Sequence, residues 1–403
     1  MIDKHAADAD SSPSTESGGL DQGRGPDQVM SRDQLAESKA YGRRELQCTL
    51  FDMGVDLVYL GIMAFWGAMV IDQWLQDWPM MGDRWVRLAT FYFIIMALHY
   101  AVSFPLSFYS GFVLEHRYKL SRQSFGRWLG RYVLRNVLTL LFGLIMVLGL
   151  FAIIWWTGPW WWLIAALATF AVTILLGQLL PVLILPLFYK VERLDDEQLR
   201  ERLERLAAGT SLHIEGIFRM KLSSETVKAN AVLAGLGRTR RVILGDTLLD
   251  RFTPEEIEVV FAHEIGHHVF HHITKIILLG LVYSMLGFYL CDQVLVGWVR
   301  ASAGSWTYDY NAVPVHALPM ILFTITLLSL ILSPLRNALG RRFETACDHY
   351  ALQLTGNVQA YRSAFSKLAR LNKADPDPHP LEVFFMHDHP PVRARLALAD
   401  QHG

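Results

Sequence analysis

Two histidines and a glutamate in the pentapeptide His263-Glu264-Ile265-Gly266-His267 could bind a metal and act on water. Residues four apart share one face of a helix, so His263 and His267 can ligate the same zinc ion. Glu264 lies one step around the helix, where it can act as a general base without binding the metal. The spacing therefore predicts a hydrolytic zinc centre.

The flanking sequence predicts that this motif lies on a helix. Thr253-Pro254-Glu255-Glu256 places a capping residue, a proline at the first helical position and a capping-box glutamate in order. The apolar run Val259-Val260-Phe261-Ala262 follows directly. We therefore expect a helix that begins near Pro254 and continues through the motif.

A third metal ligand is expected at Glu344, on a second helix. The position six residues after His267 holds Ile273, which excludes a third histidine at that common spacing. Glu344 can complete a site of two histidines and one glutamate, which leaves the fourth position for water, as in catalytic zinc sites. Asp348, one turn later, can accept the free ring N–H of a ligating histidine and fix its tautomer.

The composition predicts a membrane protein. Hydrophobic residues make up 52% of the chain, charged residues 19%, and the mean hydropathy is +0.25, which is too apolar for an ordinary soluble domain. The apolar residues are concentrated in runs long enough to span a bilayer. The six predicted spans are Phe51–Gln73, Leu88–Leu114, Val137–Trp156, Trp160–Phe188, Ile273–Val299 and Val313–Leu332. We therefore expect a mainly α fold, a polytopic α-helical membrane protein with a cytoplasmic zincin-like α+β protease domain.

Loop charges predict the orientation of these spans. Between spans two and three, six basic residues oppose the single acid Glu115, so this loop is expected in the cytoplasm. The basic residues are Arg117, Lys119, Arg122, Arg127, Arg131 and Arg135. Alternation then places both termini, the segment Tyr189–His272 and the tail with Glu344 on that side, and Arg300–Asn311 outside. A bacterial inner membrane is the expected location.

The spans divide the chain into five predicted parts. These are a disordered polar tail (1–45), four spans (46–188), a cytoplasmic protease segment (189–272), a transmembrane hairpin (273–335) and a C-terminal protease segment (336–403). In the first protease segment, Leu194–Ala208 is a predicted helix and Ile214–Lys221 a predicted strand.

A β-hairpin is also predicted, from Asn230–Leu236 and Arg241–Leu244 with a turn at Gly237-Arg238-Thr239-Arg240. The first strand could lie at a sheet edge and hold an extended substrate by its backbone, which makes Asn230 and Ala231 candidate substrate-binding residues. An ordinary structural hairpin would have the same sequence pattern.

The remaining features narrow the possible partners. Cys48, Cys291 and Cys347 are scattered and odd in number, which predicts neither a disulfide framework nor a cysteine-based metal site. No nucleic-acid motif is present, so we expect no nucleic-acid partner. The expected partners are the lipid bilayer and a peptide or protein substrate with an apolar anchor, and the expected cofactor is one Zn²⁺ per chain.

Several motifs together resemble those of the type 1 CAAX prenyl endopeptidases, a family of integral-membrane zinc metalloproteases. They are Phe112-Val113-Leu114-Glu115, Pro186-Leu187-Phe188, Lys228-Ala229-Asn230-Ala231, Arg241–Leu249, His263–His267, Glu344–Asp348 and His389-Pro390-Pro391. The resemblance implies cleavage near the C terminus of isoprenylated proteins, with zinc on His263, His267 and Glu344. It also implies that His389 is catalytic and stabilises an oxyanion, and that Arg395 orients carboxylates or binds substrate. Eukaryotic members have seven spans around a chamber, whereas six are predicted here.

Two other functions remain open at this point. A broad-specificity protease for membrane-protein quality control would use the same zinc site. A zinc transporter or sensor is suggested by a cluster of histidines, His263, His267, His268, His271 and His272. Transporters usually place their ligands inside the spans and have no need of Glu264, so the protease is favoured. His268, His271 and His272 are not expected to be ligands, because the predicted zinc shell is already filled.

Overall fold

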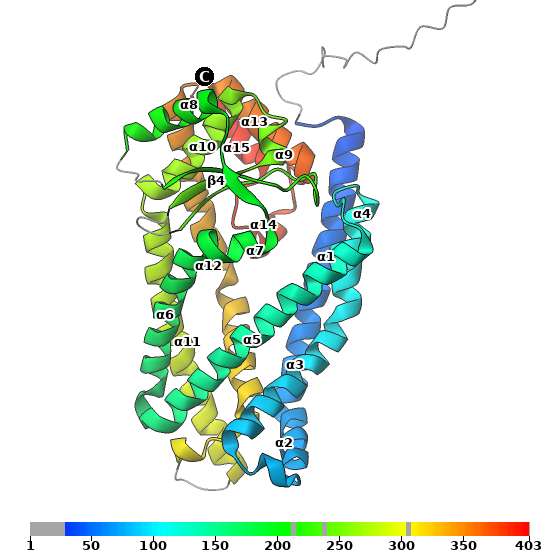
Figure 1. Ribbon diagram of the computed structural model, residues 1–403, viewed down its shortest axis with the longest axis vertical. Helices are drawn as coiled ribbons and strands as arrows, with labels where there is room; N and C mark the ends of the chain where they lie inside the picture. The colour runs from blue at the N-terminus through cyan, green and yellow to red at the C-terminus, as the bar shows by residue number, and fades with distance from the viewer. Residues whose placement is uncertain (1–28, 211–214, 236–239, 304–307, 403) are drawn as a thin grey trace, which may run out of the picture.

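The computed structural model describes residues 29–210, 215–235, 240–303 and 308–402. Long helices run side by side through one half of the molecule, and a small sheet with shorter helices lies at one end (Figure 1). The predicted fold class, a mainly helical membrane protein with an α+β protease domain, is confirmed.

The first long helix begins earlier than predicted. Helix α1 (Arg32–Ile62) continues through a π-helical turn (Met63–Gly67) into α2 (Ala68–Gln76). The prediction of a disordered tail up to residue 45 is therefore wrong from Arg32 onward, and the part before residue 29 lies outside the described residues. A capping box between Ser31 and Gln34 starts the helix, and Tyr41 is buried against the rest of the protein.

All six predicted apolar runs lie largely within long helices. The spanning elements that follow α2 are α3 (Arg84–Phe108), α5 (Phe125–Thr157), α6 (Trp161–Leu179) with α7 (Leu185–Phe188), α11 (His272–Ala303) and α12 (Leu318–Thr355). Five continuous stretches are long and apolar enough to cross a membrane, and the third, Phe125–Phe188, contains both α5 and α6. The chain reverses between these two helices at Gly158, whose positive φ of 57° suits glycine (Figure 1).

A large apolar core joins the helices away from the sheet. Phe91 of α3, Phe151 of α5, Trp161 of α6, Leu295 of α11 and Leu318 of α12 are all fully buried in it. Removing such a side chain from water stabilises a soluble protein by roughly 1.5–3 kcal/mol. Between helices in a bilayer, close van der Waals packing provides the stabilisation instead. The core fixes the direction in which α11 and α12 approach the sheet end.

Helix α12 connects the bilayer to the predicted metal site without a break. The predicted boundary between the transmembrane hairpin and the last protease segment, at residues 335 and 336, falls inside this helix, so one continuous helix carries both parts. Glu344 and Asp348 therefore lie on the extension of a helix that also carries an apolar spanning stretch. The left-handed Gly356 ends the helix at Thr355.

The sheet has four strands in the order β1-β2-β4-β3. They are β1 (Val191–Arg193), β2 (Gly216–Met220), β3 (Ala231–Ala234) and β4 (Arg241–Gly245). Strands β2 and β4 are parallel, whereas β1 and β3 pair antiparallel with their neighbours. The predicted strands Ile214–Lys221 and Asn230–Leu236 are confirmed in shorter form, and the strand predicted at Arg241–Leu244 is confirmed with Gly245 added. Strand β3 lies at the edge of the sheet that the described strands form. The predicted turn at residues 237–239 lies outside the described residues.

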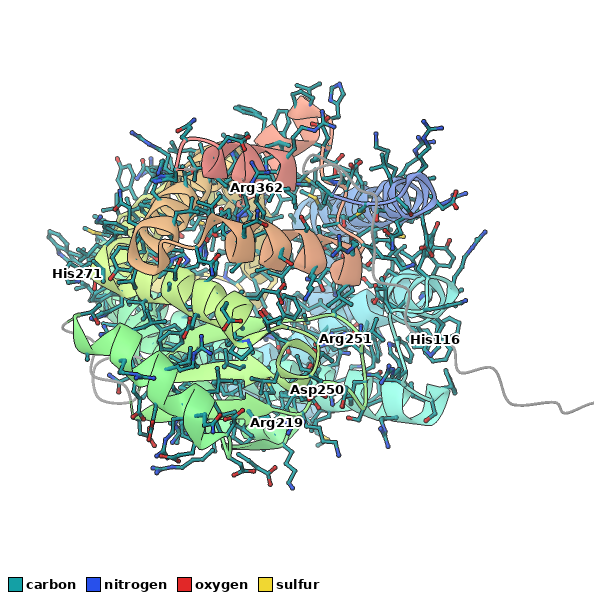
Figure 2. The ribbon with its side chains drawn as sticks, turned by 90° about the horizontal axis from the view of Figure 1, so that it is seen from above. His116, Arg219, Asp250, Arg251, His271 and Arg362 are labelled. Carbon is teal, nitrogen blue, oxygen red and sulfur yellow. The ribbon has the colours of Figure 1, made fainter. Side chains whose placement is uncertain are left out.

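Shorter helices cover the sheet end. They are α4 (Glu115–Arg117), α8 (Glu197–Ala208), α9 (Asp246–Leu249), α10 (Pro254–Val269), α13 (Val358–Asn372), α14 (Pro380–Met386) and α15 (Val392–Ala399). Seen from above, α10 lies next to the strands, and α13 packs on the other side of α10 (Figure 2). Leu203, Leu244, Phe261, Ile265 and Ala364 form the core between α8, the sheet, α10 and α13.

The basic loop between α4 and α5 packs on this same end. Ser121 forms an isolated β-bridge with Thr226, and the Arg122 N–H donates to the Glu225 carbonyl over 2.7 Å. Both protease segments and the basic loop therefore gather at one end of the molecule, as the charge pattern predicted (Figure 1).

Candidate active site

The helix that carries the two histidines is the predicted one. Helix α10 begins at Pro254, and Thr253 and Glu256 form the expected capping box. Phe261 and Ile265 are fully buried, so they orient the helix and turn His263 into the interior. The side chain of His267 is half-buried on the same face.

Helix α10 approaches α12 at a glycine. A Cβ at Gly266 would lie 3.1 Å from both Cα and Sγ of Cys347, which is tighter than nine in ten Cβ contacts and would require α12 to move away by a few tenths of an ångström. Glycine therefore permits the close contact between the two helices. This contact brings Glu344 and Asp348 of α12 to the two histidines.

The three predicted ligands meet. His263 Nε2 lies 3.1 Å from Glu344 Oε2, and His267 Nε2 lies 3.2 Å from Glu344 Oε1. One ligand atom from each residue falls within 4.8 Å of the other two, which is close enough to share one ion. His263 and Glu344 are buried, so the centre is largely shielded from water.

The donor set fits a metal ion. Among the described residues, Glu344 Oε2 is a buried oxygen without a hydrogen-bond partner, although it faces His263 Nε2. An unsatisfied buried carboxylate oxygen is costly, and a cation between it and the imidazoles would satisfy it. Two imidazole nitrogens and one carboxylate are the ligands of catalytic zinc.

Asp348 contacts the ring nitrogen of His263 that does not face Glu344, and Arg395 in turn binds Asp348. Asp348 Oδ1 accepts a hydrogen bond of 2.9 Å from His263 Nδ1. Arg395 binds both carboxylate oxygens, with Nε 2.8 Å from Oδ2 and Nη2 2.5 Å from Oδ1. Burial lowers the pKa of His263, but its contacts with Asp348 and Glu344 outweigh this and raise the pKa to about 9. These carboxylates therefore favour positive charge at the centre.

Glu264 lies beside the ligands without joining them. Its Oε2 accepts a hydrogen bond of 3.3 Å from the backbone N–H of Leu233 in β3. Burial raises the pKa of this carboxyl above its ordinary value. A carboxylate with a raised pKa accepts a proton more readily, which suits a general base.

His389 reaches the centre from the C-terminal segment. Its Nε2 lies 3.5 Å from Glu344 Oε2, while Nδ1 lies 2.7 Å from Asp388 Oδ1. The hydrogen bond to Asp388 raises the pKa of His389, so its Nε2–H is favoured as a donor. The predicted catalytic residues Glu264 and His389 thus lie on the same site.

A cavity of about 690 Å³ is lined by two of the predicted ligands, His263 and Glu344, and by Glu264. Its lining includes Asn230 and Ala231, which is where a substrate held by β3 would lie, and also Arg395. Helix α1 forms another wall through Tyr41 and Glu45, which the predicted disordered tail did not anticipate.

A hydrogen-bonded network joins α1 to the rest of the site. Tyr41 Oη donates to Glu115 Oε1 over 2.6 Å, and Lys228 Nζ lies 3.1 Å from both Tyr41 Oη and Glu115 Oε1. Lys228 begins the segment that leads into β3, so the network fixes this wall of the cavity relative to α1.

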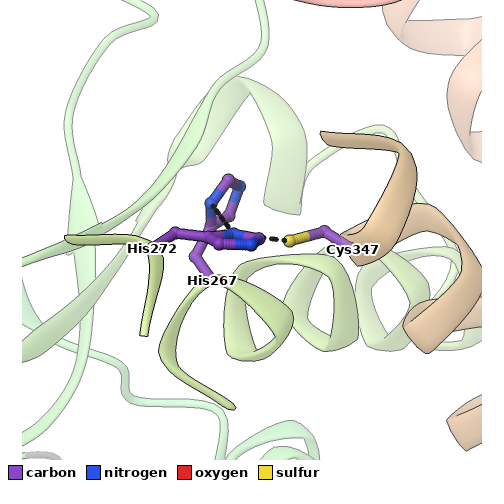
Figure 3. A group of neighbouring side chains, drawn as sticks. All are labelled: His267, His272 and Cys347. Atoms are coloured by element: carbon purple, nitrogen blue, oxygen red, sulfur yellow. Dashed lines mark hydrogen bonds between the residues drawn. The ribbon is translucent and has the colours of Figure 1, made fainter. Parts of the chain in front are cut away.

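The other histidines of the cluster separate in the structure. His268 Nδ1 lies 2.6 Å from Arg240 Nη1, and His271 is exposed at the outer edge of this end (Figure 2). His272 is buried and lies next to His267, together with Cys347 (Figure 3). This contact could not be predicted from local spacing, because α10 ends before His272 and Cys347 lies on α12.

The fold and the site define a membrane-embedded zinc metalloendopeptidase. Residues 26–190 match the family model of the CAAX prenyl protease N-terminal region with five membrane helices, and residues 193–402 match the model of peptidase family M48. The chain belongs to peptidase family M48.

Similar proteins occur in distant organisms. An uncharacterized metalloprotease from Bacillus subtilis, YhfN, is 26% identical over 93% of this chain and 88% of its own length. A CAAX prenyl protease 1 homologue from Arabidopsis thaliana is 27% identical, over 92% of this chain and 88% of its own length. The crystal structure of S. mikatae Ste24p has the same fold, with a TM-score of 0.82 and 23% identity over 92% of this chain and 90% of that one.

We expect Asp348→Ala to weaken zinc binding about 10–100-fold, because the His263 ring loses the group that fixes its tautomer. Chelator competition on the purified protein measures this. The control is Asp388→Ala, which removes a carboxylate that is mostly exposed and contacts His389 instead of a ligand. Equal zinc affinity in Asp348→Ala and the wild type would show that Asp348 does not support the site.

Proposed function

We propose that one zinc ion per chain binds to His263, His267 and Glu344, and that the enzyme cleaves proteins delivered to it by an apolar anchor. The observation that carries this proposal is the convergence of these three side chains, with atoms within 4.8 Å. Two of them, His263 and Glu344, line a cavity to which the long apolar stretch Arg32–Gln76 also contributes a wall. Zinc bound there supplies Lewis acidity to the reaction.

The surrounding residues would perform the proton transfers. Glu264 takes a proton from the attacking water and returns it to the leaving amine. The Leu233 N–H contact holds the Glu264 carboxylate in place. His389 donates from Nε2 toward the oxyanion that forms on the substrate carbonyl. Arg395 acts through Asp348, which it binds with two hydrogen bonds, although it also lines the cavity.

Strand β3 is the proposed holder of the substrate backbone. It pairs with β4 on one side, from Ala231 opposite Leu244 to Ala234 opposite Arg241, and its start lines the cavity. An extended peptide added to its other edge would pass directly in front of Glu264. Asn230 and Ala231 would then bind substrate mainly through main-chain atoms, with modest side-chain selectivity.

Replacement of Glu264 separates catalysis from metal binding. We expect Glu264→Gln to keep zinc and the fold and to lose about 10²–10⁴-fold in kcat, because the general base is absent. Peptidase assays and metal analysis on the same sample measure both effects. The matched control is Glu382→Gln, another cavity carboxylate, which contacts His387 instead of the ligands. Wild-type turnover in Glu264→Gln would exclude Glu264 as the base.

We further propose that the site faces the cytoplasm of a bacterium. The support is the excess of arginine and lysine in the loop after α4 and the packing of that loop on the protease segment. Cysteines added one at a time to a Cys48→Ser background, in which the remaining Cys291 and Cys347 are buried, test this with a membrane-impermeant thiol reagent. Asn311→Cys should react in intact spheroplasts, whereas Glu192→Cys should react only after lysis. Reaction of both from the same side would refute the topology.

The substrate class rests on the relatives. Those from Arabidopsis thaliana and Saccharomyces cerevisiae are named CAAX prenyl protease 1 homologue and CAAX prenyl protease 1, and a prenyl chain is an apolar anchor. We propose that proteins with a C-terminal lipid are preferred over unanchored peptides. Misfolded membrane proteins, whose anchor is a span, are the substrates of the quality-control alternative.

One peptide in three forms, two of them with an apolar anchor, decides between these substrates. We compare a C-terminal farnesyl cysteine, a plain cysteine and an apolar span, with Glu264→Ala as the blank. A prenyl protease should cleave the farnesylated form with a kcat/KM about tenfold or more above the other two, which corresponds to about 1.4 kcal/mol of selective binding. Equal cleavage of the lipid and span forms would instead support quality control and refute the prenyl preference.

A further inference from the structure

The second ring nitrogen of His267 contacts another histidine. His267 Nε2 faces Glu344 Oε1, and Nδ1 lies 3.3 Å from His272 Nδ1 (Figure 3). An imidazole that binds a metal through Nε2 carries its hydrogen on Nδ1, so this nitrogen must donate. His272 Nδ1 is placed to accept that hydrogen bond.

His272 is held rigidly in this position. The backbone turns at His271, whose positive φ of 55° separates α10 from α11, and His272 begins α11 with only 2% of its surface exposed. Its ring stacks on Phe343 with centroids 4.2 Å apart and planes 15° apart. Phe343 directly precedes Glu344, so the same helix positions both the ligand carboxylate and the ring that supports His267.

The neighbours of His272 Nδ1 determine its role as an acceptor. Cys347 Sγ lies 3.5 Å from the same nitrogen and approaches it from a different direction than His267 (Figure 3). A protonated thiol and the His267 Nδ1–H are both donors, and a hydrogen on His272 Nδ1 would point at the hydrogen of His267. His272 therefore carries its own hydrogen on Nε2.

We propose that His272 is a positioning residue for the metal ligand His267. It accepts the Nδ1–H of His267 and so fixes the tautomer and the ring plane that present Nε2 to the metal. This inference rests on the proposed zinc site. The two ligand histidines then differ in their support, since His263 donates to the charged Asp348 and His267 to a neutral ring.

The same three side chains could instead hold a second metal ion. Ligand atoms of His267, His272 and Cys347 lie within 4.8 Å of one another. That arrangement would require His267 to bind one metal through each nitrogen and therefore to lose its second ring proton. A simple hydrogen bond needs no such ionisation, so the geometry favours the positioning role.

Two substitutions of His272 separate hydrogen bonding from packing. His272→Leu fills buried space without an acceptor, whereas His272→Asn places an amide oxygen near the position of Nδ1. We expect His272→Leu to weaken zinc binding about 10–100-fold and to alter the visible absorption of the Co²⁺-substituted protein. His272→Asn should remain close to the wild type in both measurements.

The controls are the neighbours of His272 in sequence and in space. His271→Asn changes an exposed histidine at a positive φ that asparagine accepts, and Cys347→Ala removes the thiol. Both should bind zinc like the wild type. Zinc affinity is read by chelator competition without any substrate, so a wild type that binds zinc but cleaves nothing would refute the proposed function and leave this test intact.

Three outcomes would overturn the positioning role. The first is unchanged zinc affinity in His272→Leu. The second is an equal loss in His272→Leu and His272→Asn, which would assign the effect to packing. The third is binding of two Co²⁺ ions by the wild type with a thiolate charge-transfer band that Cys347→Ala removes, because His267 Nδ1 would then be a metal ligand.

Discussion

The contact between α10 and α12 is the constraint on which the rest of this structure depends. Neither helix holds a metal site alone, since two histidines come from one and the carboxylate from the other. Gly266 lets the two backbones approach so closely that Cys347 of α12 lies where a side chain at position 266 would begin. The supporting contacts are made to residues of these two helices. The Leu233 N–H donates to Glu264 of α10, and Arg395 donates to Asp348 of α12.

Charge and the membrane act together at this centre. Glu264, Glu344 and Asp348 converge on it, and the guanidinium of Arg395 offsets only part of their charge. The remainder favours a cation at the histidines, which is why the pKa of His263 is raised despite burial. Because one helix, α12, carries both the last apolar stretch and Glu344, the position of the cation site is set relative to the membrane-spanning part of that helix.

Much of the site could be predicted because the spacing of nearby residues in the sequence determines which of them share a helix face. A helix is enough to bring His263 and His267 to one face, and the capping residues Thr253 and Glu256 indicate where that helix begins. What could not be predicted depends on tertiary contacts. The polar start of α1 has no apolar periodicity and forms because Tyr41 reaches Glu115 and Lys373 pairs with Glu37. Strand β1 is only three residues long and exists through its pairing with β2.

The same limit explains the residues that the sequence did not bring together. His272 and Cys347 are 75 positions apart and meet only because the chain turns at His271 and α12 crosses α10. Arg395 and Asp348 are 47 positions apart and meet because α15 packs against α12. No local pattern encodes either contact, since each depends on how two helices cross.

The order of these elements along the chain gives the membrane control over when the enzyme becomes active. The two ligand histidines on α10 are synthesised before α11 and α12, whereas Glu344 follows the last apolar stretch. A growing chain therefore holds half a metal site until both helices of the final hairpin have inserted and returned the chain to its starting face. A chain that fails to insert this hairpin leaves Glu344 away from the histidines. Assembly of the complete ligand set therefore depends on the final hairpin, because α11 and α12 separate the two histidines from Glu344 along the chain.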